Sequence, residues 1–115
     1  MREMLTTDML RTYGADVDDG LKRCMNNEGF YLRLVEKMAA DPSFEALEEA
    51  VESGNLEKGF EIAHALKGVT ANLSLTPIHE PIREITELLR NGTATDYSPY
   101  LKQIAEARDK LCALL

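Results

Sequence analysis

Glycine, proline and helix-capping residues divide this chain into helix-length segments with apolar stripes, and this division constrains the fold more than any other feature. No segment alternates apolar and polar residues for long enough to predict a strand. The predicted helices cover residues 4–13, 16–23, 27–40, 42–53, 55–73, 76–90 and 98–115, with a proline resetting the first long segment at residue 42. The pattern predicts an all-α protein: an antiparallel up-and-down four-helix bundle with an additional short N-terminal helix as a lid or brace.

The composition is typical of a globular domain. Of the 115 residues, 44% are hydrophobic and 29% are charged, which predicts a single domain over residues 1–115. The net charge of -7 disfavours nucleic acid and anionic membrane surfaces as general partners. The chain shows no signal-peptide pattern and no apolar run of about 20 residues, so we expect a cytoplasmic protein. The polar outer surface of the predicted bundle makes a monomer the default state.

The segment 55–73, NLEKGFEIAHALKGVTANL, carries the most informative pattern. At about 100° per residue its apolar side chains form a predicted core stripe. The stripe consists of Ile62, Leu66, Val69 and Leu73, widened by Gly59, Ala63 and Thr70. His64 lies almost opposite, with Lys67 and Gly68 beside it on the predicted exposed surface. A glycine inside a helix costs about 0.5–1 kcal/mol relative to alanine, so its place beside the histidine suggests that a partner must come close.

The motif A-H-A-L-K-G, residues 63–68, resembles the H-x-L-K-G signature of the histidine-containing phosphotransfer (HPt) domain family. By this resemblance His64 matches the phosphoryl-accepting histidine, Lys67 the neighbouring cation and Gly68 the small residue that gives a partner access. The following V-T-A-N-L, the segment 13–24 and the aromatic pair at positions 30 and 31 are also similar to the family. The resemblance therefore covers nearly the whole chain.

Two positions depart from the family pattern. Ser74 stands where the family often has glycine. Pro81 lies inside the next predicted helix, where the missing N–H would kink the helix or delay its start. Both changes fall shortly after the histidine helix.

The chemistry of the individual residues agrees with the resemblance. A neutral imidazole attacks phosphorus through one ring nitrogen, and phosphoryl transfer requires mainly positioning and charge stabilisation. Lys67 can neutralise phosphoryl oxygens as a mobile charge. Gly68 and Ala71 keep the surface near the histidine low, and Phe60 offers an apolar contact to a docking partner. Glu61 is a candidate to accept a hydrogen bond from the other imidazole nitrogen and fix its tautomer.

The chain carries no G-x-x-x-x-G-K-[ST] or other glycine-rich nucleotide loop, so we expect no ATP binding, no cofactor and no kinase activity. The resemblance implies a phosphocarrier in two-component signalling, a phosphorelay intermediate that takes a phosphoryl group on His64 from a receiver-domain aspartate and passes it to another. The implied partners are a response-regulator receiver domain, a hybrid histidine kinase or both, with magnesium on the receiver alone. A non-catalytic interaction or scaffold module with a vestigial motif is the alternative.

Other residues that could carry chemistry have simpler interpretations. The spacing Glu61-x-x-His64 fits one half of a di-iron site in a four-helix bundle, but the sequence has no second E-x-x-H. Cys24 and Cys112 are isolated, so we expect free thiols and no metal site. His79 falls in the first turn of its predicted helix, where we expect an inert or locally capping role.

Overall fold

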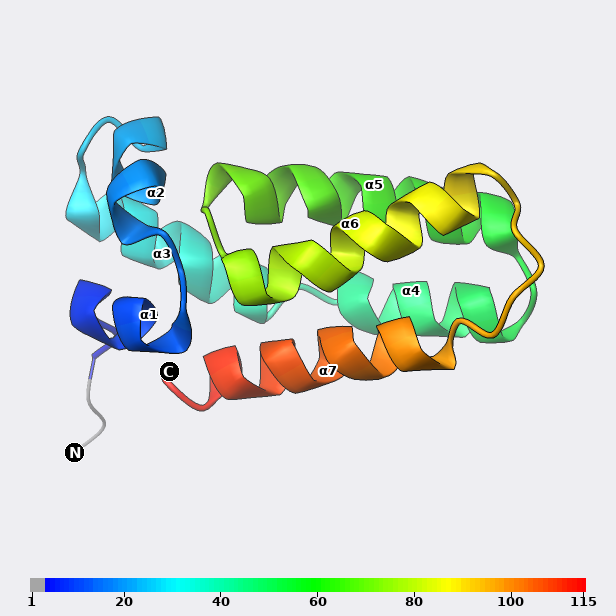
Figure 1. Cartoon of the computed structure of the whole chain (residues 1–115). Coiled ribbons are helices and arrows are strands. Elements are labelled where there is room, and N and C mark those ends of the chain that lie inside the picture. The colour runs from blue at the N-terminus through cyan, green and yellow to red at the C-terminus, as the bar shows by residue number, and fades with distance from the viewer. Residues whose placement is uncertain (1–3) are drawn as a thin grey trace.

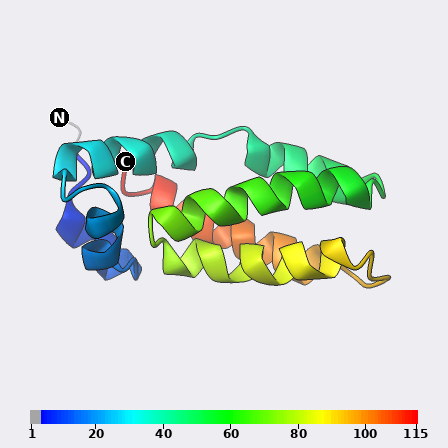
Figure 2. The ribbon, with the colours of Figure 1, turned by 90° about the horizontal axis from the view of Figure 1, so that it is seen from above.

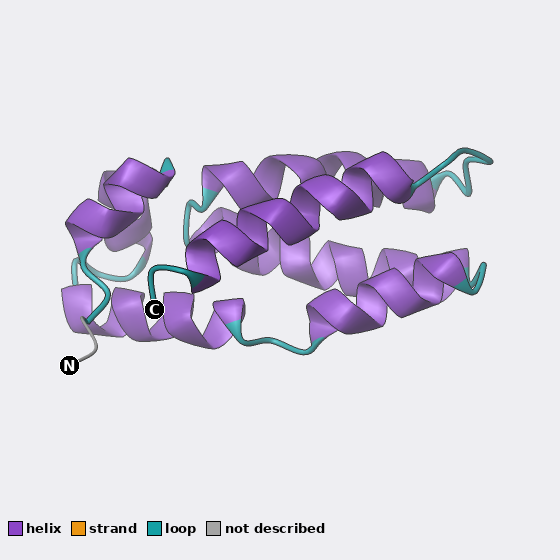
Figure 3. Cartoon of the chain, turned by 90° about the horizontal axis from the view of Figure 1, so that it is seen from below, coloured by secondary structure: helices purple, strands orange, loops and turns teal. Residues whose placement is uncertain are grey.

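The computed structural model describes residues 4–115, and Figures 1 and 3 show only helices and connecting loops in that range. The helices are α1 (Thr7–Tyr13), α2 (Val17–Arg23), α3 (Glu28–Ala39), α4 (Ser43–Glu52), α5 (Leu56–Asn72), α6 (Thr76–Arg90) and α7 (Ser98–Cys112). Each lies within a segment that the sequence predicts to be helical, so the all-α prediction is confirmed. The predicted single domain also includes residues 1–3, which lie outside the described residues. No helix within residues 4–115 has both the length and the apolar character needed to cross a bilayer.

Four antiparallel legs make up the bundle. The helices α3 and α4 lie end to end as the first leg, and α5, α6 and α7 are the other three (Figures 1 and 2). α5 packs on α4 and α6, and α6 packs in turn on α7, in a molecule of 42 × 30 × 19 Å. The short helices α1 and α2 lie at the end of the bundle where α5 turns into α6 (Figure 1). The predicted bundle is confirmed, with two short helices rather than one at its N-terminal end.

Side-chain caps fix where four of the helices begin. The side-chain oxygens of Thr6, Asp16, Asn27 and Asn55 each accept a hydrogen bond from the backbone N–H three residues further on. A cap of this kind satisfies an N–H that has no partner inside the helix, and its loss costs about 0.5–2 kcal/mol. These starting points are local signals that can be read from the sequence.

α6 begins at Thr76 and continues through its internal proline, Pro81. Leu75 occupies the cap position, and Thr76 is the first helical residue. Pro81 lies inside the helix with its ring buried. Because it falls near the start of the helix, its missing N–H removes one early hydrogen bond, and burial of the apolar ring offsets part of that loss. Of the two expected consequences of Pro81, a kink or a delayed start of the helix, the delayed start is wrong.

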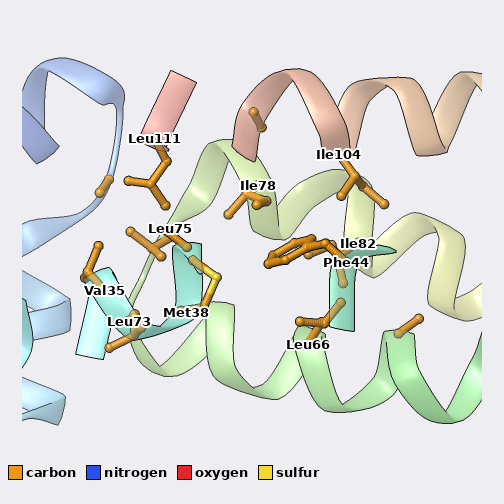
Figure 4. Close-up of a cluster of buried hydrophobic side chains, with 14 of the residues drawn as sticks. Val35, Met38, Phe44, Leu66, Leu73, Leu75, Ile78, Ile82, Ile104 and Leu111 are labelled. Atoms are coloured by element: carbon orange, nitrogen blue, oxygen red, sulfur yellow. The ribbon is translucent and has the colours of Figure 1, made fainter. Parts of the chain in front are cut away.

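Apolar side chains from all four legs meet along the bundle axis. Figure 4 shows Phe44 of α4, Leu66 of α5, Ile82 of α6 and Ile104 of α7 in one cluster of side chains, and all four are buried. Complete burial of such a side chain stabilises the fold by about 1.5–3 kcal/mol relative to exposure. This core fixes which surface of each leg faces solvent.

An arginine of α7 holds the junction between α3 and α4. The Arg108 guanidinium donates from Nε to the carbonyl of Ala39 at 3.0 Å and from Nη1 to Glu45 Oε1 at 2.6 Å. Its Cζ lies 4.7 Å from the centre of the Phe44 ring. The same guanidinium lowers the pKa of the Glu45 carboxyl. Arg108 thus links α7 to both α3 and α4 at the point where these two helices meet.

A close contact joins the N-terminal helices to the end of α5. Gly20 packs so tightly that an added Cβ would lie 2.6 Å from Tyr31 Cε1 and 2.9 Å from the Leu73 carbonyl oxygen. The Tyr31 hydroxyl donates to that same carbonyl at 2.9 Å, and burial raises the Tyr31 pKa to about 12. Ser74 adopts a φ of 52°, accepts the Asp16 N–H at its carbonyl and donates from its hydroxyl to Asp19. The positive φ explains why glycine suits position 74, and these bonds hold serine there.

α5 is rotated relative to the predicted core stripe. Leu66 and Leu73 are buried as expected, but Ile62 is only half-buried and Val69 is 41% exposed. The buried surface instead centres on the small residues of the helix, Gly59, Ala63 and Thr70. Small side chains allow the axis of α6 to come close on that side, and this turns Val69 outward. The prediction that Val69 is buried is therefore wrong.

Candidate functional site

His64 lies in the middle of α5 on the exposed side of the bundle. Its neighbours Ala63 and Leu66 are buried, whereas the imidazole is exposed, as predicted. The backbone of this helix is anchored by the core on one side, so the imidazole is presented on a rigid support. An exposed imidazole on a rigid element can act as a nucleophile toward a second macromolecule.

An aromatic contact positions the imidazole. The Phe60 ring stacks on His64 with centroids 5.6 Å apart and an interplanar angle of 24°. Within residues 4–115 no hydrogen bond joins His64 to Glu61, whose side chain is exposed. The predicted hydrogen bond is therefore not present in the structure. Side chains in a helix lean toward its N-terminus, so the His64 imidazole reaches Phe60 one turn back.

Lys67 leans toward α6 rather than into open solvent. Its Nζ lies 3.7 Å from Glu87 Oε1, and its side chain is 29% exposed. The other carboxylate oxygen of Glu87 lies 3.5 Å from Arg90 Nε, and Arg90 Cζ lies 5.1 Å from the centre of the Phe60 ring. Glu87 and Arg90 are not among the site residues predicted from the sequence. Their spacing of one turn on the polar side of the next helix was the only available signal.

Gly68 leaves an open surface beside His64. A Cβ built on this residue would meet nothing within 4 Å, and the glycine itself is exposed. Ala71 is half-buried and small, so the helix surface stays low along the same side. The structure therefore brings Phe60, Lys67 and Gly68 around His64, with Ala71 one turn beyond Lys67.

An apolar hollow lies next to this surface, between α3 and α5. It has a volume of about 320 Å³. The exposed Val69 forms part of its wall, together with Leu34, Met38 and Leu73. The outward position of Val69 thus gives the exposed side of α5 an apolar component that the predicted stripe did not include.

The sequence of this chain matches a known protein family. The sequence profile described as the Hpt domain matches residues 34–114, which is most of the chain. The chain belongs to the Hpt domain family. Hpt domains are phosphocarriers of two-component systems rather than kinases. The match includes the whole of α5 and begins after the segments 13–24 and 30–31, and no curated protein matches the chain significantly.

The second histidine of this Hpt domain has a different environment. His79 Nδ1 lies 3.0 Å from Thr70 Oγ1, and that hydroxyl also lies 2.9 Å from the Leu66 carbonyl oxygen and 3.2 Å from the Lys67 carbonyl oxygen. A hydrogen bond thus joins the His79 ring to the Thr70 hydroxyl. Burial lowers the His79 pKa. His79 does lie in the first turn of α6, and it links that helix to α5.

The remaining candidate residues do not assemble into a site. Cys24 is buried and Cys112 is exposed, and neither is in a disulfide. Among the residues that the structure describes, no three His, Cys, Asp or Glu side chains are grouped as metal ligands would be.

Proposed function

We propose that this Hpt domain is a phosphorelay intermediate that accepts a phosphoryl group on His64 from a receiver-domain aspartyl phosphate and donates it to a second receiver aspartate. The observation that carries the proposal is the exposed imidazole of His64, held by Phe60 on a rigid helix with an open glycine beside it. His79 is a poorer candidate because it is half-buried and bonded to Thr70.

The transfer needs no proton from this chain. The unprotonated nitrogen of neutral His64 attacks phosphorus, the N–P bond forms, and the P–O bond to the aspartate breaks. The aspartate leaves as a carboxylate, and the other ring nitrogen keeps its proton. Reversal of the same steps onto a second aspartate empties the carrier.

The division of labour follows from the residues present. This chain supplies the imidazole, the Lys67 ammonium for the phosphoryl oxygens, and a docking surface formed by Phe60, Glu61, Gly68 and Ala71. The receiver domain, alone or within a hybrid histidine kinase, supplies magnesium and the aspartate. This chain then needs no cofactor of its own. We also propose that the protein works as a monomer in the cytoplasm, where such partners present their receiver domains.

Phosphate uptake from an acetyl-phosphate-charged receiver domain tests the proposal. The chain has two histidines, so His79→Gln is a matched control for His64→Gln. Mass spectrometry of the wild type and His79→Gln should locate acid-labile phosphate on residue 64, and His64→Gln should take up none. The free energy of unfolding of His64→Gln should stay within about 0.5 kcal/mol of the wild type because the side chain is exposed. Binding without uptake by the wild type would favour the scaffold alternative.

A further inference from the structure

The Glu87 carboxylate of α6 pairs with the Lys67 ammonium, which is the cation in the proposed reaction. The Lys67 ammonium is the nearest positive charge along α5 to His64, one turn away, and it pairs with the Glu87 carboxylate at 3.7 Å. We infer that Glu87 is a positioning residue that holds Lys67 beside α6 and competes with the phosphoryl group for it. This inference rests on the proposed function, since it concerns the state of the same site.

Arg90 keeps the Glu87 carboxylate in that place. Arg90 Nε lies 3.5 Å from Glu87 Oε2, while Glu87 Oε1 faces Lys67. The Arg90 guanidinium also lies over the Phe60 ring, which stacks on His64. The carboxylate is thus held between two cations at the edge of the site, although its side chain is 51% exposed.

The competition has a direct consequence for the carrier. One ammonium cannot neutralise a carboxylate and a phosphoryl group equally, so phosphorylation of His64 must draw Lys67 away from Glu87. The carboxylate then loses a partner. This loss disfavours the phosphorylated state, so Glu87 makes phosphorylated His64 a readier phosphoryl donor. A relay intermediate needs this property because it must release what it accepts.

The solvent exposure of Lys67 and Glu87 limits how strongly their ion pair can shift the transfer equilibrium. An ion pair at this distance between partly exposed groups is weak, so removal of the Glu87 charge should shift the transfer equilibrium toward phosphohistidine by about threefold to fivefold. The shift should shrink at high salt because screening weakens interactions between exposed charges.

A double-mutant cycle tests the inference. The ratio of phosphorylated carrier to phosphorylated receiver is measured at equilibrium for the wild type, Glu87→Gln and Glu84→Gln. Glu84 is a matched control because it is exposed on the same helix and its replacement removes the same charge. Glu87→Gln should raise the ratio about threefold to fivefold, and Glu84→Gln should change it less than about twofold. In a Lys67→Ala background the effect of Glu87→Gln should shrink toward that of Glu84→Gln.

The outcomes separate the two proposals. A wild type that takes up no phosphate would overturn the phosphorelay function and this inference with it. If the wild type is phosphorylated but Glu87→Gln matches Glu84→Gln or lowers the ratio, the inference alone fails. An undiminished effect in the Lys67→Ala background would show that Glu87 acts without Lys67, and would also overturn it. Thermal unfolding of each variant verifies that the bundle remains intact.

Discussion

The two glycines of α5 have different surroundings: Gly59 is closely packed and Gly68 is open to solvent. A Cβ on Gly59 would lie 3.2 Å from Val51 Cγ2 of α4 and 3.6 Å from Leu89 Cδ2 of α6. A Cβ on Gly68 would meet nothing within 4 Å. The first glycine allows three helices to pack closely, whereas the second has no packing partner to explain it. The same residue type therefore serves packing in the region around Gly59 and leaves an open surface in the region around Gly68.

This contrast predicts that stability and phosphoryl transfer depend on different parts of α5. Changes near Gly59 should act on the free energy of unfolding, because the side chain there must fit between Val51 and Leu89. Changes near Gly68 should act on transfer, because a partner must approach His64 across that surface.

The largest expected effect is on stability at the packed glycine. Gly59→Gln forces a long amide side chain into the contact between α4, α5 and α6, and we expect it to lower the free energy of unfolding by about 2–5 kcal/mol. Urea denaturation followed by circular dichroism measures this. Glu57→Gln, an exposed change on the same helix, is the control and should stay near the wild type. An unchanged midpoint for Gly59→Gln would mean that α5 does not pack as described.

The next effect is on transfer at the open glycine. Gly68→Gln should leave the helix folded but place a long side chain one turn from His64, where the receiver has to approach within reacting distance. We expect phosphoryl transfer to slow by more than about tenfold, measured as the initial rate from a phosphorylated receiver. Ala105→Gln adds the same side chain to an exposed position of α7 and should transfer normally. Normal transfer by Gly68→Gln would place the docking surface elsewhere.

The smallest effect is a gain in stability at the same open position. Gly68 has a helical conformation and free space for a methyl group, so Gly68→Ala should raise the free energy of unfolding by up to about 1 kcal/mol. Equilibrium urea denaturation measures the change. A destabilised Gly68→Ala would show that the glycine serves helix packing, which would remove the contrast with Gly59.

Several features of the molecule follow from local sequence signals. The caps at Asp16, Asn27 and Asn55 and the apolar periodicity predict the helices and the four-leg bundle, since both signals act within a few residues. The exposure of His64 follows in the same way, because its side chain lies on the opposite side of the predicted helix from the apolar residues. Its motif also carries the resemblance to the family that the profile match confirms.

Other features were decided by packing between helices. The small residues of α5 let α6 approach on one side and turned Val69 toward solvent, which periodicity within one helix cannot reveal. The contacts of Glu87 with Lys67 and of Arg90 with Phe60 depend on how α6 is aligned against α5 after the turn at Ser74. The sequence by itself determined which segments are helical and which residue is the exposed imidazole. Only the tertiary structure decided the rotation and alignment of the helices, because these depend on side-chain volumes from several segments at once.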